Sequence, residues 1–321
     1  MLWRSVVGRI AISIVTLWVV SLMIFGMTNL LPGDIAQIML GQMATPENTA
    51  ALREKLGLDK PAHIQYLVWL GNVASGDLGI SKAGLGAGLG TPIVEMLGPR
   101  AFATLRLTVW VSVIAIPISL FLGLIAAMHP GTRLDRAVTF STLSLISVPE
   151  FLVATFLVLI FAVHLGWLPS VVFLRGGESG WLLIKTLAMP TLTLVIVVSS
   201  QIIRMTRATV LNVMSSPYIE MAILKGVTRR KIILRHALLN AIGPIVNVIA
   251  LNIAWLVGGV VVVEVIFAYP GLAKLMVEAV LLRDLPLVQA CAMIFCVTYI
   301  VLIFLADMAS ILSNPRLRHP K

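Results

Sequence analysis

Few side chains in this sequence have the types and spacing that catalysis requires. The five histidines stand singly, without the Ser-His-Asp arrangement of a hydrolase or the spacing of a metal site: His63, His129, His164, His236 and His319. The two cysteines, Cys291 and Cys296, are five residues apart in an apolar stretch and fall on different faces of a helix. The sequence therefore predicts no catalytic residue and no metal site, and an enzyme is not expected.

A glycine-rich stretch, KAGLGAGLGTP at residues 82–92, has the alternating glycines that suggest phosphate binding. A Walker A loop needs a Lys followed by Ser or Thr after its last glycine, because the Lys reaches the phosphates and the hydroxyl holds magnesium. No Lys follows the glycines here, so the stretch is interpreted as a flexible linker. No recognisable motif for binding ATP is present in the chain.

The most specific signal lies in one charged stretch, YIEMAILKGVTRRKIILRHALLNAIGP, which begins at Tyr218 between two apolar stretches. Ser216 is a candidate N-cap, Pro217 suits the first helical position, and Glu220 lies in the first turn, where the helix dipole favours an acid. Gly226 is placed to end the helix in the left-handed conformation. We therefore expect a short helix that stops at Gly226.

A second amphipathic helix is expected directly after the first. Thr228 is its candidate N-cap, and the helix is predicted to run through about Leu238. Two interpretations follow from its charge and amphipathicity. The helices either lie on acidic lipids or enter a groove of a soluble partner. Charge alone leaves both interpretations open.

The elements that position this stretch are predicted to be membrane helices. Of the 321 residues, 59% are hydrophobic and 12% are charged, whereas soluble domains have about 45–50% apolar and about 25% charged residues. A helix needs roughly 20 apolar residues to cross a hydrocarbon core about 30 Å thick. Six windows without Asp, Glu, Lys or Arg approach this length: 10–33, 107–132, 151–174, 186–203, 237–263 and 285–306. The expected fold class is an all-α integral membrane protein with six transmembrane helices.

Orientation follows from the basic residues, because short segments rich in Lys and Arg stay in the cytoplasm. If both termini are cytoplasmic, the inside segments hold more than half of the 24 Lys and Arg, against two acids, Asp135 and Glu220. The net charge of +10 is thus attributed to membrane topology. No nucleic-acid partner is expected, because no basic patch is interleaved with aromatic residues.

The segment from residue 34 to about residue 100 is the one long loop, and the charge count places it outside. We expect a short helix from Pro46 to Gly57 and, after Pro61, an amphipathic helix through Trp69. The apolar positions of the second helix follow helical spacing: Ile64, Leu67, Val68 and Gly71. This face is predicted to lie on the membrane surface or against the other helices.

Polar and charged residues in or near the windows are candidates for transport roles. Candidate pathway residues gather in the fourth and fifth windows: Ser199, Ser200, Gln201, Asn247 and Asn252. Hydrogen bonding between helices is the alternative role for each. Glu150 and Asp307 are interpreted as structural, at helix ends or subunit contacts. Glu264 precedes a turn signal, and with it forms a candidate outer gate or docking rim: Glu264, Tyr269, Pro270 and Gly271.

The spacing of Glu220, Ala222, Gly226 and His236-Ala237-Leu238 resembles the EAA loop of permease subunits of ATP-binding-cassette (ABC) importers, with Met221 at the motif's first alanine. Eight further stretches are similar to the dipeptide, oligopeptide and nickel permease family and occur in its order: LLPGD at 30–34, LREKLGLDKP at 52–61, GDLGIS at 76–81, SVPEF at 147–151, LGWLP at 165–169, VVVEVIFAYPGL at 261–272, RDLPLVQ at 283–289 and NPRLR at 314–318. Together they cover nearly the whole chain and best resemble the first permease subunit type.

The resemblance implies a type I ABC importer permease fold. Residues 1–95 would hold the first helix and the long loop, 96–313 the permease core with a coupling loop at 216–240, and 314–321 a cytoplasmic tail. It implies that Glu220, Ala222 and Gly226 form the core of a coupling helix in a groove of an ATPase subunit. Flanking contacts are implied for five residues: Lys225, Arg229, Arg230, Arg235 and His236.

The resemblance also implies the partners of this chain. They are a second homologous permease, favoured as a different chain, two ATPase subunits that bind ATP and magnesium, an extracytoplasmic solute-binding protein and the lipid bilayer. No cofactor is expected in this chain. The implied location is a bacterial or archaeal plasma (inner) membrane, and the implied cargo is peptides or a related small solute, including nickel complexes.

Two other classes of membrane protein fit the sequence less well. A secondary transporter usually shows internal repeats, broken helices and midplane ionisable residues, and neither the repeats nor the midplane charges are evident in the sequence. A membrane scaffold without transport would not need a loop that docks an ATPase. An ABC importer permease is therefore the expected function.

Overall fold

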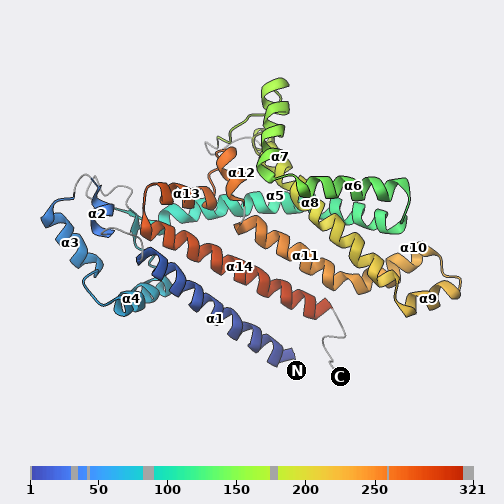
Figure 1. The fold of residues 1–321 in the computed structure, drawn as a ribbon, viewed down its shortest axis with the longest axis horizontal. Helices are drawn as coiled ribbons and strands as arrows, with labels where there is room; N and C mark the ends of the chain where they lie inside the picture. Colours follow the sequence, from blue (N-terminus) through green and yellow to red (C-terminus); the bar gives the residue numbers. More distant parts are fainter. Residues whose placement is uncertain are drawn as a thin grey trace. The chain divides into compact units, whose positions relative to one another are not determined.

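The computed structural model describes residues 2–29, 35–41, 44–81, 90–173, 180–258 and 260–313. These residues are mostly helical (Figure 1). The LLPGD stretch at 30–34, most of the glycine-rich stretch and the tail at 314–321 lie outside the described residues. The chain divides into two compact units. The first contains Met1–Ile10, Leu105–Tyr269 and Val301–Lys321, and the second contains Ala11–Thr104 and Pro270–Ile300.

The first unit is built around a long helix, α8, which packs against α6, α7 and α11. Its elements, in chain order, are α5 from Leu105 onward (Ile93–Met128 in full), α6 (Arg133–Ser147), α7 (Glu150–Leu157), the π-helix η3 (Val158–His164), α8 (Gly180–Met214), α9 (Pro217–Leu224), α10 (Arg229–Ile232), the π-helix η4 (Ile233–Ala237), α11 (Leu238–Gly258) and α12 (Val261–Ile266). Half of the most apolar part of α8 is buried, which makes it the central helix of this unit.

The second unit contains most of the first helix, the long loop that follows it and most of the last helix. Its elements are α1 from Ala11 onward (Leu2–Asn29 in full), α2 (Ile35–Leu40), α3 (Pro46–Leu56), α4 (Ala62–Ser75), β1 (Ile80–Ser81), β2 (Thr91–Pro92), the start of α5, α13 (Leu272–Leu281) and most of α14 (Leu285–Ser313). The two strands are antiparallel and pair Ile80 with Pro92. A buried cluster joins α5, α13 and α14: Ile93, Leu97, Leu272, Leu275, Ala279, Leu287, Ala290 and Cys291.

The two helices expected after the first window are both present. The Thr45 hydroxyl accepts a hydrogen bond from the Asn48 amide and caps α3, and Gly57 ends α3 with φ of 66°. Ile64, Leu67 and Val68 on the predicted apolar face of α4 are exposed, so this face is not buried against the other described helices, and its location on the membrane surface stays a prediction. Instead, Tyr66 packs on α1. Its hydroxyl lies 2.8 Å from the Ser21 hydroxyl, and its ring contacts Phe25 edge to face.

Among the described residues, five helices are long and apolar enough to cross a membrane: α1, α5, α8, α11 and α14. The sixth predicted span, at 151–174, does not form a single long helix. The window at 151–174 ends early, because α7 and η3 have 8 and 7 residues and stop at His164. At 1.5 Å per residue they reach about 22 Å, short of a hydrocarbon core of about 30 Å. A sixth span exists only if α6 and α7–η3 count together, and they meet at a bend of 101° (Figure 1).

Helices α5 and α8 are in close contact at Gly123. A Cβ atom at this position would lie 2.9 Å from Thr206 Cβ and 3.0 Å from the Ile203 carbonyl oxygen. We expect Gly123→Ala to lower the unfolding free energy by about 1–3 kcal/mol, because the added methyl overpacks this contact. Thermal unfolding of the purified protein measures the effect. Gly98→Ala is the matched control, because a Cβ at Gly98 in the same helix meets nothing within 4 Å. Equal melting temperatures for the two variants would contradict this prediction.

Candidate functional site

The first helix of the loop at 216–240 forms as expected. Pro217 begins α9, and Glu220 lies in its first turn. Gly226 has φ of 74°, and its amide donates to the Ile223 carbonyl at 2.9 Å, so the left-handed end at Gly226 is confirmed. The capping prediction for Ser216 is wrong in one respect. Ser216 occupies the N-cap position, but its hydroxyl donates to the Val213 carbonyl and makes no capping bond to α9.

The second helix of the loop does not end near Leu238 as predicted. It begins as α10, passes through the π-helical turn η4 and continues without a break into α11. The apolar side chains at 232, 233, 237 and 241 continue directly into the membrane helix, which explains why no separate end forms. The loop is therefore a helix, α9, placed between the ends of two long helices, α8 and α11 (Figure 1).

The base of the loop is anchored in a buried cluster of the first unit. This cluster joins residues of α5, α8, η4 and α11: Ala127, Val210, Ile233, Ala237, Ala241 and Ile245. Ile219 of α9 and Ile232 of α10 are also fully buried. Close packing in this cluster holds the ends of α8 and α11, on either side of α9, against each other.

The outer surface of α9 is apolar and exposed. Leu224 is 75% exposed, and Met221 and Ile223 are each 55% exposed. Helical spacing predicts Ile223 on the apolar side with Ile219, but only Ile219 is buried. Glu220, Lys225 and Arg235 are exposed, and Ala222 is half-buried. The side chains of three further candidates lie outside the described part of the structure: Arg229, Arg230 and His236.

The candidate pathway residues in α8 and α11 differ in how their polar groups are used. The Ser200 hydroxyl and the Asn252 amide donate to carbonyls of their own helices, at Ile196 and Val248, each at 2.8 Å. Ser119 of α5 donates to the Ser199 carbonyl at 3.5 Å. The buried Ser199 hydroxyl has no hydrogen-bond partner in the described part of the chain. Gln201 and Asn247 are half-buried.

The candidate gate residues Glu264 and Tyr269 are both 0% exposed, at the end of the first unit. The Tyr269 amide donates to the Glu264 carbonyl at 2.8 Å, and Arg106 of α5 donates a hydrogen bond to the Tyr269 side chain. Burial raises the pKa of the Tyr269 phenol, while Arg106 acts in the opposite direction. Pro270 and Gly271 belong to the second unit, where Gly271 precedes α13.

Sequence reasoning missed Arg106, although one signal was available. Arg106 stands directly before the second apolar window, and Glu264 directly follows the fifth. Isolated charges at such positions usually pair with a partner. A second pair in the first unit joins Asp135 of α6 and Arg207 of α8, which lie a few residues beyond the second and fourth apolar windows. Arg207 Nε and Nη2 donate to Asp135 Oδ1 and Oδ2 at 2.5 and 2.9 Å.

Asp135 is almost fully buried and is held in place from several sides. Its Oδ2 also accepts the Gly131 amide at 2.9 Å, and its own amide donates to the Thr132 hydroxyl at 3.3 Å. The pair ties the start of α6 to the part of α8 that leads into α9. The two other charges interpreted as structural lie at helix ends or in pairs: Glu150 begins α7, and Asp307 of α14 forms a salt bridge with Arg9.

Comparison with known proteins shows that the chain is similar to membrane transport subunits. Residues 119–319 match the family described as binding-protein-dependent transport system inner membrane component, and residues 1–87 match the N-terminal part of such membrane components. The chain is 33% identical over 317 residues to a probable peptide ABC transporter permease, y4tP, of Sinorhizobium fredii, covering 98% of this chain and 99% of the relative.

Two further relatives are named for glutathione transport. The glutathione transport system permease protein GsiC of Shigella flexneri is 34% identical over 314 residues, and that of Escherichia coli strain K12 is 33% identical over 314 residues. Each alignment covers 98% of both chains. These relatives are transport subunits and not enzymes. The chain belongs to the inner-membrane permease components of binding-protein-dependent ABC importers.

Proposed function

We propose that this chain is one of two homologous permeases that together frame a pathway for peptides or a related small solute. Two separate ATPase subunits bind ATP and magnesium and drive import, and an extracytoplasmic binding protein delivers the solute. Both termini lie in the cytoplasm, as the distribution of Lys and Arg favours. The substrate class is supported by relatives named for peptide and glutathione transport.

The observation that carries the proposal is the form of the 216–240 loop. Its short helix α9 exposes an apolar surface with Glu220 and Lys225 beside it, and its base is anchored through buried side chains to two long helices. An apolar helical face with flanking charges is the form that a groove of a partner protein accepts. We assign Glu220, Ala222 and Gly226 to the centre of this contact, with the loop's basic residues around it.

Co-purification tests the assignment. The tagged chain, expressed with the ATPase and permease genes of its transport system, is expected to retain the ATPase after extraction in mild detergent. Leu224→Asp is expected to reduce retention at least tenfold, because it places a charge in the apolar contact. Leu281→Asp is the matched control, since Leu281 is 78% exposed on α13. Equal loss in both variants would show that the effect is not specific to the loop.

For the pathway, we propose that Ser199, Gln201 and Asn247 present polar groups to the solute. The Ser200 hydroxyl and the Asn252 side-chain amide each donate a hydrogen bond to a carbonyl of their own helix. We therefore assign these two residues mainly to helix packing, and toward the solute they offer only their oxygen atoms as acceptors. The gathering of polar groups in α8 and α11, the helices that carry the loop, supports this proposal.

We also propose that Glu264 and Tyr269, with Arg106, hold an outer gate closed, and that Pro270 and Gly271 form the turn that follows in the chain. Glu264→Gln is expected to raise ATP hydrolysis in the absence of binding protein severalfold, because it removes a buried charge from the closed arrangement. Tyr269→Phe, which keeps the ring and loses the hydroxyl, is expected to give a smaller rise. ATPase assays with and without binding protein measure both effects, and wild-type basal rates in both variants would contradict the gate.

A further inference from the structure

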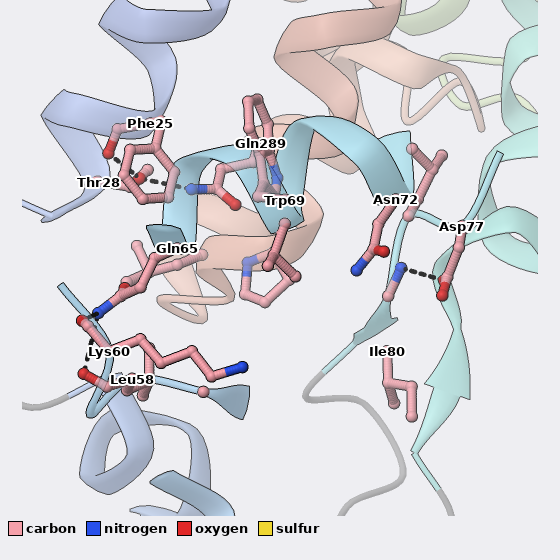
Figure 2. Close-up of a pocket in the computed structure, with 16 residues that line it drawn as sticks. Phe25, Thr28, Leu58, Lys60, Gln65, Trp69, Asn72, Asp77, Ile80 and Gln289 are labelled. Atoms are coloured by element: carbon pink, nitrogen blue, oxygen red, sulfur yellow. Dashed lines mark hydrogen bonds between the residues drawn. The ribbon is translucent and has the colours of Figure 1, made fainter. Parts of the chain in front are cut away.

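A cavity of about 210 Å³ lies within the second unit, where three of the family-like stretches meet (Figure 2). Gly57, Leu58 and Lys60 come from LREKLGLDKP, the segment Asp77–Ile80 comes from GDLGIS, and Leu285, Pro286 and Gln289 come from RDLPLVQ. The remaining walls come from the end of α1 and from one side of α4. Neither the coupling loop nor the proposed gate gives these stretches a role.

The walls of the cavity are fixed by hydrogen bonds between distant segments. Gln65 Nε2 donates to the Leu58 and Lys60 carbonyls at 2.9 and 2.7 Å, which holds the turn after α3 against α4. Gln289 Nε2 of α14 donates to the Thr28 hydroxyl of α1 at 2.5 Å. These bonds use both amide hydrogens of Gln65 and one of Gln289, so the cavity has a defined shape before any ligand enters.

The segment 77–81 is held in the same way. The buried Ser81 hydroxyl donates to Asp284 Oδ2 at 2.6 Å, and the Gly79 amide donates to Asp77 Oδ1 at 2.9 Å. The second bond orients the Asp77 carboxylate at one edge of the cavity. This edge therefore carries a negative charge whose position is set by the backbone.

A positive charge lies at the opposite side. Figure 2 shows the Lys60 side chain extending into the cavity from one side, with Asn72 and Asp77 on the other. A Cβ at Gly57 would lie 3.7 Å from Lys60 Cδ and 3.9 Å from Nζ, so the lysine side chain lies along the left-handed glycine. The Lys60, Asn72 and Asp77 side chains are exposed, and within the described residues the Lys60 ammonium, the Asn72 side-chain amide and Asp77 Oδ2 make no hydrogen bond or ion pair.

The rest of the lining is apolar or aromatic, with Phe25, Trp69, Leu78 and Ile80. A volume of about 210 Å³ accommodates one or two amino-acid units. Opposite charges on facing walls, with an amide and apolar surface between them, complement a molecule that has a carboxylate at one end and an ammonium at the other.

We propose that this cavity is a binding subsite for a small zwitterion, an amino acid or dipeptide, with the carboxylate at Lys60 and the ammonium at Asp77. The proposal deepens the proposed import of peptide-class solutes and rests on it for the placement of this segment outside the membrane. Asn72 supplies a hydrogen bond to the bound solute, and Trp69 packs against its side chain.

Titration of the purified permease and ATPase complex, without binding protein, tests the subsite. The probes are alanyl-alanine, its N-acetylated form and its C-terminal amide, and binding is followed by isothermal calorimetry. The wild-type complex is expected to bind the zwitterion about tenfold more tightly than either capped form, because each cap removes one charged partner. Lys60→Gln is expected to abolish the difference between the acid and the amide.

Asp77→Asn is expected to abolish the difference between the free and the acetylated amino terminus, while its side-chain carbonyl still accepts the Gly79 amide. Asp59→Asn is the matched control, because Asp59 neighbours Lys60 but does not line the cavity. Equal binding of all three probes, or no binding, would overturn the proposal. If the complex imports peptides but the titration detects no binding in the cavity, only the subsite is refuted. If the complex hydrolyses ATP but imports no peptide, the proposed substrate class is refuted.

Discussion

Asp135→Asn is expected to lower the unfolding free energy of the permease by about 3 kcal/mol and to reduce coupled transport strongly. The substitution removes the charge that balances the Arg207 guanidinium. Removing one partner of a buried ion pair costs about 3–5 kcal/mol. We expect a value at the lower end of this range, because 27% of the Arg207 side chain is exposed. Thermal unfolding and solute uptake per ATP hydrolysed are the two measurements.

The double variant Asp135→Asn with Arg207→Gln separates the ion pair from general damage. Neither side chain is then charged, so the loss is expected to be smaller than the sum of the two single variants. Arg133, at the start of the same helix α6, provides a surface control, since its side chain is exposed. Arg133→Gln is expected to leave stability and transport unchanged. Strict additivity of the single variants would contradict a direct interaction.

The location of the pair explains why transport is included in this prediction. Arg207 lies in the part of α8 that leads into α9, and Asp135 lies at the first turn of α6. We therefore expect a shift of α8 to move α6 as well, because two charge-assisted hydrogen bonds join them. Loss of the pair is expected to lower uptake more than ATP hydrolysis, which a purely global loss of stability would not do.

Gly226→Val is expected to leave membrane insertion intact and to uncouple ATP hydrolysis from transport. The φ of 74° at Gly226 is left-handed, a conformation that costs an L-residue about 1–2 kcal/mol, and a β-branched side chain is especially unfavourable there. A Cβ at this position meets nothing within 4 Å, so the effect acts through the backbone and not through a clash. The turn after α9 is expected to reorganise, which displaces the docking surface.

Gly226→Asn is the matched control, because asparagine tolerates the left-handed conformation better than other residues with a side chain. It is expected to retain most of the uptake, while valine loses most of it. Both variants are assayed for uptake and ATP hydrolysis in the same proteoliposomes. Normal uptake per ATP in the valine variant would contradict the role assigned to Gly226.

The features that sequence reasoning predicted correctly depend on local signals. Gly57 and Gly226 end their helices in the left-handed conformation as expected, because this preference belongs to glycine itself. Long apolar windows predicted α1, α5, α8, α11 and α14, since membrane crossing requires a minimum length that any sequence must show. The family resemblance, carried by motifs in order along the chain, is confirmed by the comparisons.

The features that were missed depend on contacts between distant residues. Hydropathy alone predicts one continuous span at 151–174, because the sequence stays free of charged residues well past His164, where the helix ends. The pairing of Asp135 with Arg207, 72 positions apart, and of Arg106 with Tyr269 is set by how the helices pack. The cavity beside Lys60 likewise forms only when α1, α4 and α14 come together.

The most direct test of the proposed importer is solute uptake into proteoliposomes that contain this permease, its partner permease and the two ATPases. A labelled dipeptide is supplied outside, with and without the binding protein, and ATP with magnesium is enclosed on the side of the coupling loop. Uptake is expected only when both the binding protein and ATP are present, and a non-hydrolysable ATP analogue is expected to abolish it. Uptake that is equally fast without ATP would contradict an ATP-driven permease and would favour a secondary transporter.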